Sequence, residues 1–249
     1  MQPDAQLHSQ LRRLKLSGVL HTLEMRLLTA QQNQLDYKTF LSLVLDDELD
    51  ARQARKVERL LTHARFGAEQ TLEQFDFALA PGLNTTLIRE LATMGFLARG
   101  EGVIFTGPPG TGKTHLAKAL GHAACRRGYT VCFHKFHDLF SGLVKAELAG
   151  TLDAELARAI KCDLLILDDF AFRKIDHAAS EQLYTIVDSR YGAQSTILTS
   201  NRALADWMGI FPDAVIAGAI LDRLTHQAHQ IQLKGDSQRK KLMGKMPAT

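Results

Sequence analysis

The sequence predicts an α/β fold, in which a three-layer domain with a central parallel sheet follows a small all-α domain. After residue 84, short aliphatic runs alternate with helical stretches, and the runs lie at residues 103–105, 130–133, 164–167 and 196–199. This alternation is typical of a parallel sheet that is covered by helices on both faces. Before residue 66, apolar residues instead recur at spacings of three and four, which is typical of amphipathic helices.

The composition is that of an ordinary globular protein, because 45% of its 249 residues are hydrophobic and 23% are charged. The net charge of +3 gives only a weak bulk argument for nucleic acid, so any basic surface is local. The three cysteines lack metal-ligand spacing and are expected to be reduced thiols. No apolar run is long enough to span a bilayer and the first residues lack the apolar core of a signal peptide, so we expect a cytoplasmic protein without a membrane partner.

The N-terminal part is predicted to be a small helical bundle. Its apolar repeat is interrupted at Ser17-Gly18, and a second long helix is expected to start at Asp36 as its N-cap, to turn Phe40 and Val44 inward, and to end before Gly67. The segment 67–84 is interpreted as a connection. We therefore expect a helical domain at residues 1–70, facing a partner or DNA, and the sheet-containing domain at residues 71–249.

A phosphate-binding loop is predicted where the first aliphatic run ends. The pattern G-x4-G-K-T is complete, the run 103–105 precedes it, and a helical stretch follows it. Glycines let the loop turn its amide hydrogens around phosphates, Lys113 is expected to reach the β and γ phosphates of ATP, and Thr114 supplies a hydroxyl ligand for Mg²⁺. The expected nucleotide-binding residues are Gly107, Pro108, Pro109, Gly110, Thr111, Gly112, Lys113, Thr114 and His115.

Acidic and amide side chains follow two further strands. The run 164–167 is aliphatic throughout, which is typical of a strand buried on both faces, so Asp168 and Asp169 are expected at its carboxyl end, where open α/β sheets bind ligands. We expect Asp168 to bind Mg²⁺ and Asp169 to activate the attacking water. Asn201, after the run 196–199, is either a turn residue or an amide that hydrogen-bonds the γ-phosphate or this water.

These motifs, in this order and spacing, resemble those of AAA+ ATPases, in which Asn201 would be the sensor 1 residue. The segments Ala219-Ile220-Leu221-Asp222-Arg223-Leu224 and Gly235-Asp236-Ser237-Gln238-Arg239, with GKTHLAKALG after the phosphate loop, resemble the IstB family of transposition helper ATPases, close relatives of the DnaC helicase loaders. The resemblance covers nearly the whole chain. It implies a DNA-binding ATPase that forms a ring or a helical filament of identical subunits.

The resemblance also assigns two arginines. Arg223 matches the arginine finger, which reaches the nucleotide of the neighbouring subunit, although a surface ion pair is the alternative. Arg239 resembles the sensor 2 arginine, but in Arg239-Lys240-Lys241 it fits a solvated or phosphate-binding tail equally well. Asp169 departs from the glutamate that many AAA+ enzymes have, so hydrolysis is expected to be slow or dependent on a partner.

Two basic segments are candidates for contact with DNA. Arg52, Arg55, Lys56 and Arg59 fall at i, i+3, i+4 and i+7 and share one helix face, which is either a phosphate contact, a solvated face, or a surface for a transposase or helicase. The second segment, 135–161, is predicted to be helical and carries Lys145 and Arg158; in initiator and loader relatives this region faces the central channel. We expect binding to the DNA backbone rather than to a base sequence.

The function expected from these residues and the resemblance is that of an ATPase that assembles on duplex DNA and assists an IstA-like transposase in target selection or DNA remodelling. One alternative is a helicase loader that grips a replicative helicase, because it shares every catalytic motif. An alternative of another class is a structural DNA-binding protein that uses ATP as an assembly switch and hydrolyses little of it.

Overall fold

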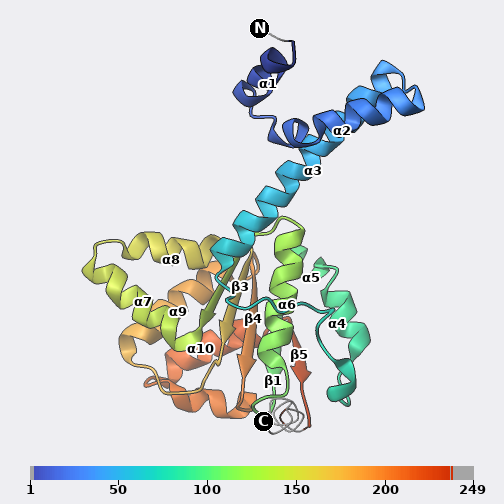
Figure 1. Cartoon of the computed structure of the whole chain (residues 1–249). Helices are drawn as coiled ribbons and strands as arrows, with labels where there is room; N and C mark the ends of the chain where they lie inside the picture. The colour runs from blue at the N-terminus through green and yellow to red at the C-terminus, as the bar shows by residue number, and fades with distance from the viewer. Residues whose placement is uncertain (1–2, 236, 238–249) are drawn as a thin grey trace, which may run out of the picture. The chain divides into compact units, whose positions relative to one another are not determined.

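The computed structural model describes residues 3–235 and 237 and divides the chain into two compact units, Met1–Arg59 and Leu60–Thr249 (Figure 1). The division falls inside a long helix and lies N-terminal to the domain boundary that the sequence predicts after residue 70. Among the described residues, no helix is long and apolar enough to cross a bilayer.

The first unit is a helical bundle with a small core. Asp36 accepts hydrogen bonds from the backbone N–H groups of Lys38 and Thr39, at 2.9 and 3.2 Å, which confirms it as the N-cap of the third helix. The buried apolar side chains of the unit are Leu11, Val19, Leu23 and Val44. The helices are α1 (Pro3–Arg13), α2 (Ser17–Asn33) and α3 (Tyr37–Ala64).

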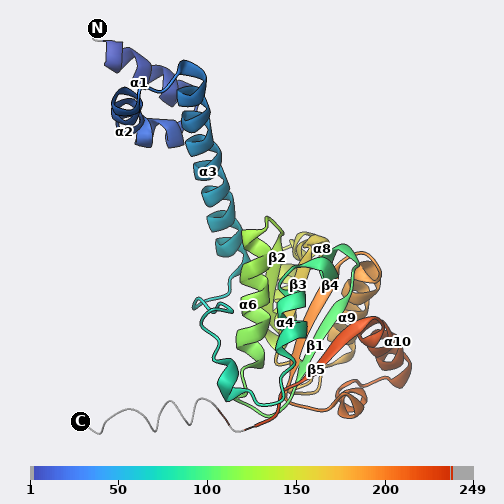
Figure 2. The same ribbon diagram turned by 90° about the vertical axis from the view of Figure 1, so that its right-hand side faces the viewer.

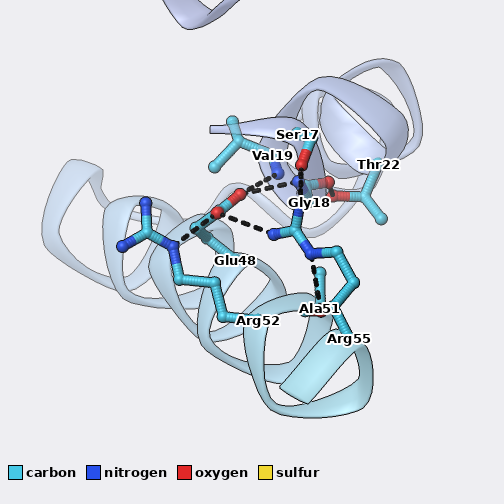
Figure 3. A network of polar contacts seen from close by, with 8 residues as sticks. All are labelled: Ser17, Gly18, Val19, Thr22, Glu48, Ala51, Arg52 and Arg55. Atoms are coloured by element: carbon cyan, nitrogen blue, oxygen red, sulfur yellow. Dashed lines mark hydrogen bonds and ion pairs between the residues drawn. The ribbon is translucent and has the colours of Figure 1, made fainter. Parts of the chain in front are cut away.

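A buried carboxylate joins α2 to α3 in this unit (Figure 3). Glu48 is only 3% exposed, and its carboxylate accepts hydrogen bonds from the backbone N–H groups of Gly18 and Val19 at 2.6 and 3.3 Å. Arg52 and Arg55 donate to the same carboxylate at 2.7 and 3.3 Å. Burial raises the pKa of Glu48, but the hydrogen bonds from Arg52 and the two amides outweigh burial, so its pKa lies below the ordinary value.

The second unit is a three-layer α/β domain with a parallel sheet, as predicted, and in its described residues the strand order is β2-β3-β4-β1-β5 (Figures 1 and 2). Its strands are β1 (Gly102–Thr106), β2 (Val131–Lys135), β3 (Leu164–Asp168), β4 (Ser195–Ser200) and β5 (Ala228–Gln232). Its helices are η1 (Phe77–Leu79), α4 (Thr85–Leu91), α5 (Gly95–Ala98), α6 (Lys113–Arg126), α7 (Phe136–Leu148), α8 (Leu152–Lys161), α9 (His177–Arg190), η2 (Leu204–Ile210) and α10 (Ala214–Thr225).

Two hydrophobic cores cover the two faces of the sheet. Strand β3 is fully buried and turns Leu164 and Ile166 into one core and Leu165 and Leu167 into the other. The first core receives side chains of α4, α5 and α6, and the second receives side chains of α7, α8, α9 and α10. Because the side chains of residues 164–167 alternate between two apolar cores, this part of the strand is aliphatic throughout.

Four of the five strands in residues 3–235 lie where the aliphatic runs predict them, whereas β5 was missed. Its sequence, AHQIQ, is mostly polar, and within it only Ile231 is buried, so it carries no aliphatic run. Within the part of the chain that the structure describes, it is an edge strand that pairs with β1 alone. The segment predicted as a connection is also more than a linker, because Phe75 and Ala80 are buried in the first core.

The strand order brings the predicted site residues to one edge of the sheet. Strand β4 lies between β1 and β3, and Thr106 at the end of β1 pairs with Ser200 at the end of β4. Because all strands are parallel, the loop after Thr106, the acids after β3 and the residues after Ser200 emerge on the same side. The strand order therefore brings together, at one edge of the sheet, the motifs that are far apart in the sequence.

We expect Glu48→Ala to lower the free energy of unfolding of the first unit by about 2 kcal/mol, because it leaves two buried amides without their acceptor and removes one acceptor from each of two guanidinium groups. Since the pKa of Glu48 is depressed, its contribution is present at neutral pH and is lost as the pH falls through that depressed value. Hydrogen exchange of α2 and α3 peptides in the full chain measures the effect. The exposed Asp50→Ala on the same helix is the control, and equal protection in both variants would contradict the prediction.

Candidate nucleotide-binding site

The loop between β1 and α6 has the backbone of a phosphate cradle. Gly107, Gly110 and Gly112 have φ angles of 139°, 81° and 102°, a region that favours glycine. A side chain at Gly107 would collide with the carbonyl oxygen of Leu233, and one at Gly110 with the side chain of Ser237. The glycines are thus required both by the turn and by the chain segment that crosses it after β5.

Lys113 lies inside this curve and is only 5% exposed. Its ammonium donates hydrogen bonds to the carbonyl oxygens of Gly107 and Pro108 at 2.8 and 2.7 Å. The hydroxyl of Thr111 donates to the same Pro108 oxygen at 2.9 Å. These bonds hold a cation at the amino end of α6, where backbone N–H groups and the helix dipole also favour an anion.

Asp168 at the end of β3 is tied to the phosphate loop and to β4. Its Oδ1 accepts hydrogen bonds from the hydroxyls of Thr114, at 2.8 Å, and Thr199, at 2.5 Å. Asp168 is 3% exposed, so this carboxylate is held in one position by two neighbouring elements. The predicted magnesium pair, Thr114 and Asp168, is brought together by these contacts although 53 residues of chain separate the two.

Asp169 and Asn201 line the same pocket, which has a cavity volume of about 520 Å³. Asp169 has a φ angle of 57°, and its N–H donates to the hydroxyl of Thr199 at 3.1 Å, so a left-handed turn directs the chain away from the strand after Asp168. Asn201 is exposed at the end of β4. Pro109, Gly110, Gly112 and His115 of the predicted set also line this pocket.

Two lysines of this pocket were missed in the sequence. Lys118, one turn after Thr114 on α6, and Lys135, the last residue of β2, line it together with Phe133 and Gln70. The Lys118 ammonium lies 4.8 Å from the centroid of the Phe133 ring. Burial lowers the pKa of Lys118, Asp168 raises it and Lys135 lowers it, with burial dominant. The sequence contained a signal for Lys135, because this lysine follows the run 130–133 after one intervening residue, His134, near the end where a parallel strand carries its ligand-binding residues.

His115 has a second contact besides the pocket. Its Nε2 donates to the carbonyl oxygen of Thr71 at 2.8 Å, and its ring meets the edge of Phe75 with centroids 5.3 Å apart. The histidine therefore fastens the segment that precedes η1 onto the first turn of α6.

The side chains present fit a magnesium ion. Mg²⁺ prefers oxygen ligands, keeps several waters, and takes one or two protein ligands beside phosphate oxygens. The hydroxyl oxygen of Thr114 and the carboxylate of Asp168 are such ligands, and they already lie within hydrogen-bond distance of each other at the open end of the phosphate loop.

Arg223 lies elsewhere in the domain. Its Nε is 2.9 Å from a carboxylate oxygen of Asp188, its Nη1 donates to the carbonyl oxygen of Ala219 at 2.9 Å, and its guanidinium lies near the rings of Tyr184 and Tyr191. It lines a separate cavity with Gly102, the first residue of β1, whereas the phosphate loop follows the last residue of that strand. Within one chain, Arg223 is thus at the opposite end of the sheet from the nucleotide pocket.

The basic residues considered for DNA have mixed surroundings. The side chains of Arg52 and Arg55 bind Glu48 but remain 55% and 51% exposed, and Lys56 and Arg59 on the same helix are exposed. In the second unit, Lys145 is exposed on α7, while Arg158 of α8 donates to the carbonyl oxygen of His63 at 2.7 Å. Arg239 lies outside the described residues.

The phosphate loop before α6 and the placement of β4 between the phosphate-loop strand and the acid-bearing strand define the class of protein, which is that of the P-loop nucleotide-binding proteins. Comparison with known proteins refines the class to a family. The sequence profile of the IstB-like ATP binding proteins matches residues 9–245, and the chain belongs to this family.

A relative and two solved structures illustrate the likeness. The chain is 39% identical over 231 residues to a protein of the insertion sequence IS21 of Pseudomonas aeruginosa that is described as ATP-binding, covering 93% of this chain and 87% of the relative. The AMPPCP-bound DnaA of Aquifex aeolicus shares the fold at 24% identity, with a TM-score of 0.59 over 72% of this chain and 54% of DnaA. The DnaC helicase loader does so at 24% identity, with a TM-score of 0.53 over 60% of this chain and 87% of the loader.

We expect Lys113→Ala to weaken ATP binding at least about tenfold, because it removes the cation held inside the phosphate loop. Calorimetric titration of the full chain with ATP measures the affinity. Lys161→Ala, an exposed lysine at the end of α8, is the matched control and should bind like the wild type. Equal affinities for all three proteins would contradict this use of the loop.

Proposed function

We propose that this chain is an ATPase that assembles as a homo-oligomer on duplex DNA and assists the transposase of an insertion sequence. The observation that carries the proposal is the arrangement of Lys113, the Thr114–Asp168 pair and Asp169 around one pocket. A loop that holds phosphates needs no second acidic residue for binding alone, whereas hydrolysis needs a group that positions water.

Each side chain has a role that follows from its position. Lys113 and the loop amides hold the triphosphate, and Thr114 and Asp168 would hold Mg²⁺, which offsets phosphate charge when bound. Asp169 follows Asp168 directly, where its left-handed backbone turns the chain out of the strand, and its carboxylate would accept a proton from water. Asn201 lines the same pocket and would orient the γ-phosphate or that water.

The position of Arg223 supports shared sites between subunits. The residue lies at the amino end of the sheet, so it cannot serve the nucleotide of its own chain without crossing the domain. A neighbour's pocket is the site where its guanidinium would offset charge that develops on the γ-phosphate. Its ion pair with Asp188 would then have to be exchanged for the phosphate during assembly.

The relatives and the basic residues support the proposed partners. The IS21 relative is described as part of an insertion sequence, and mobile elements of this kind need a transposase. The cations on α3, with Lys145 on α7, would contact phosphates, and repetition of a few cations per subunit along a filament strengthens binding despite a small net charge.

We expect Asp169→Asn to leave the affinity for ATP within about twofold of the wild type and to lower DNA-stimulated turnover by about a hundredfold or more, because the amide accepts no proton. Phosphate release with and without duplex DNA measures this, and Asp50→Ala is the acidic control on another unit. If the wild type binds ATP and DNA but releases no phosphate above background, the chain is a nucleotide-gated structural DNA-binding protein instead of an ATPase.

We expect Arg223→Ala to retain ATP binding and to lose at least about a hundredfold in turnover. Mixing it with Lys113→Ala should restore part of the activity, since the intact pocket of one variant meets the intact arginine of the other. A mixture of Lys113→Ala with Asp169→Asn, two variants with defective pockets, is the control and should stay inactive. The absence of recovery at every mixing ratio in the first mixture would argue against shared sites.

A further inference from the structure

The segment that follows the two acids ends in an exposed aromatic and two exposed cations. Phe172 is 55% exposed, and Arg173 and Lys174 beside it are also exposed. The guanidinium of Arg173 lies 5.8 Å from the centroid of the Phe172 ring. The two residues before them, Phe170 and Ala171, are by contrast completely buried. We call residues 172–174 the aromatic-cationic tip.

The chain between the tip and the nucleotide pocket is tightly held. The N–H of Phe170 donates to the carbonyl oxygen of Thr199 at 2.7 Å, and the hydroxyl of Ser200 donates to the carbonyl oxygen of Phe170 at 2.7 Å. The Phe170 ring packs against Phe136 and Trp207, with centroids 4.6 Å apart in both pairs. Because Phe170 is held by these contacts, a displacement of the tip would be transmitted to the backbone of Asp169.

The backbone on both sides of Phe170 is strained. Asp169 and Ala171 have φ angles of 57° and 62°, which a residue with a side chain adopts at a cost of about 1 kcal/mol or more. With this backbone, successive side chains point to different places: Asp169 lies at the pocket, Phe170 in the core and Phe172 at the surface. Strain of this kind persists where the surrounding structure holds it, and it is concentrated at functional segments.

The surroundings of the tip favour an anionic partner. A cavity of about 300 Å³ lies between α7 and residues 173–176, lined by Val144, Arg173, Lys174 and Asp176 among others. The carboxylate of Asp176 accepts a hydrogen bond from the N–H of Ala179 at 2.8 Å and so caps α9. The lining of this cavity contains two cations, Arg173 and Lys174, and one carboxylate, Asp176, so positive charge is in excess there.

We propose that the aromatic-cationic tip contacts duplex DNA, with Arg173 and Lys174 on phosphates and Phe172 against the sugars and base edges, and that this contact sets the position of Asp169. The inference rests on the proposed function and names the site through which DNA acts on hydrolysis. Cations supply the salt-dependent attraction to the backbone, and an exposed apolar wedge beside them is the means by which proteins deform a duplex. Phe172 is only three residues after Asp169, whose carboxylate is proposed to position the attacking water.

The test compares Phe172→Ala, Phe172→Tyr and the double variant Arg173→Ala/Lys174→Ala in the full chain. The double variant should bind a fluorescent duplex about tenfold more weakly, with the slope of log affinity against log salt reduced by about one to two. Phe172→Ala should lose most of the stimulation of ATP hydrolysis by DNA while its rate without DNA stays within about twofold of the wild type. Phe172→Tyr keeps an aromatic ring and should restore the stimulation.

Two matched variants control for surface changes elsewhere, Arg89→Ala on α4 and Val215→Ala on α10, both of which alter exposed side chains. An ATP affinity equal to that of the wild type shows that each variant is folded. If the tip variants bind duplex with the affinity and salt slope of the wild type and are stimulated equally, the tip is not a DNA contact and the inference is wrong, while the proposed ATPase stands.

A different result distinguishes failure of the proposed function. If the wild type itself neither binds duplex nor responds to it, both the DNA-dependent ATPase and the tip contact are wrong. If the tip variants keep all DNA properties but fail to bind a purified transposase of an insertion sequence, the surface serves a protein partner, which also overturns the inference.

Discussion

The hydrogen bonds that Thr114 and Thr199 donate to Asp168 are the interaction on which the rest of the site depends. They join the first turn of α6, the end of β3 and the end of β4 at a carboxylate with almost no exposure to water. A buried carboxylate is stable only where donors or cations surround it, so the three elements are held in register by the requirement to satisfy this one group. The phosphate loop, Asp169 and Asn201 take their positions from those same elements.

The nucleotide pocket and Arg223 lie at opposite ends of the sheet. The carboxyl ends of the strands carry the pocket, and the amino ends carry Arg223 with its ion pair to Asp188. The proposed shared site has its two halves at these opposite ends, so it would require head-to-tail association, which produces rings or filaments. The segment after β3 adds a route to the surface, because strained backbone and the buried Phe170 link the pocket to exposed residues.

The sheet and most of the candidate nucleotide site could be predicted from the sequence, because short motifs with well-defined chemistry indicate them. The phosphate loop, the acids after β3 and four of the strands lie in buried or glycine-dependent positions that leave clear patterns. The polar edge strand β5 left none, since it buries a single aliphatic side chain, Ile231, and owes its place to hydrogen bonds with β1.

Contacts between distant segments were beyond sequence reasoning. Glu48 looked like one acid among several on α3, yet the close approach of Gly18 turns it into a buried acceptor for α2. Arg190 is 2% exposed and donates to the carbonyl oxygens of Ala159, Cys162 and Ser195 among others, so a residue of a type that is usually exposed stabilises the interior. Lys118 joins the pocket only because α6 packs beside Phe133.

The central claim, that Thr114 and Asp168 form the metal position of an ATP site, is tested most directly by electron paramagnetic resonance of Mn²⁺ added in place of Mg²⁺ to the ATP-loaded protein. The account predicts that Asp168→Asn weakens Mn²⁺ binding at least about tenfold while Asp50→Asn, an exposed acid on α3, leaves it unchanged. Identical Mn²⁺ affinities in the wild type and in Asp168→Asn would contradict it.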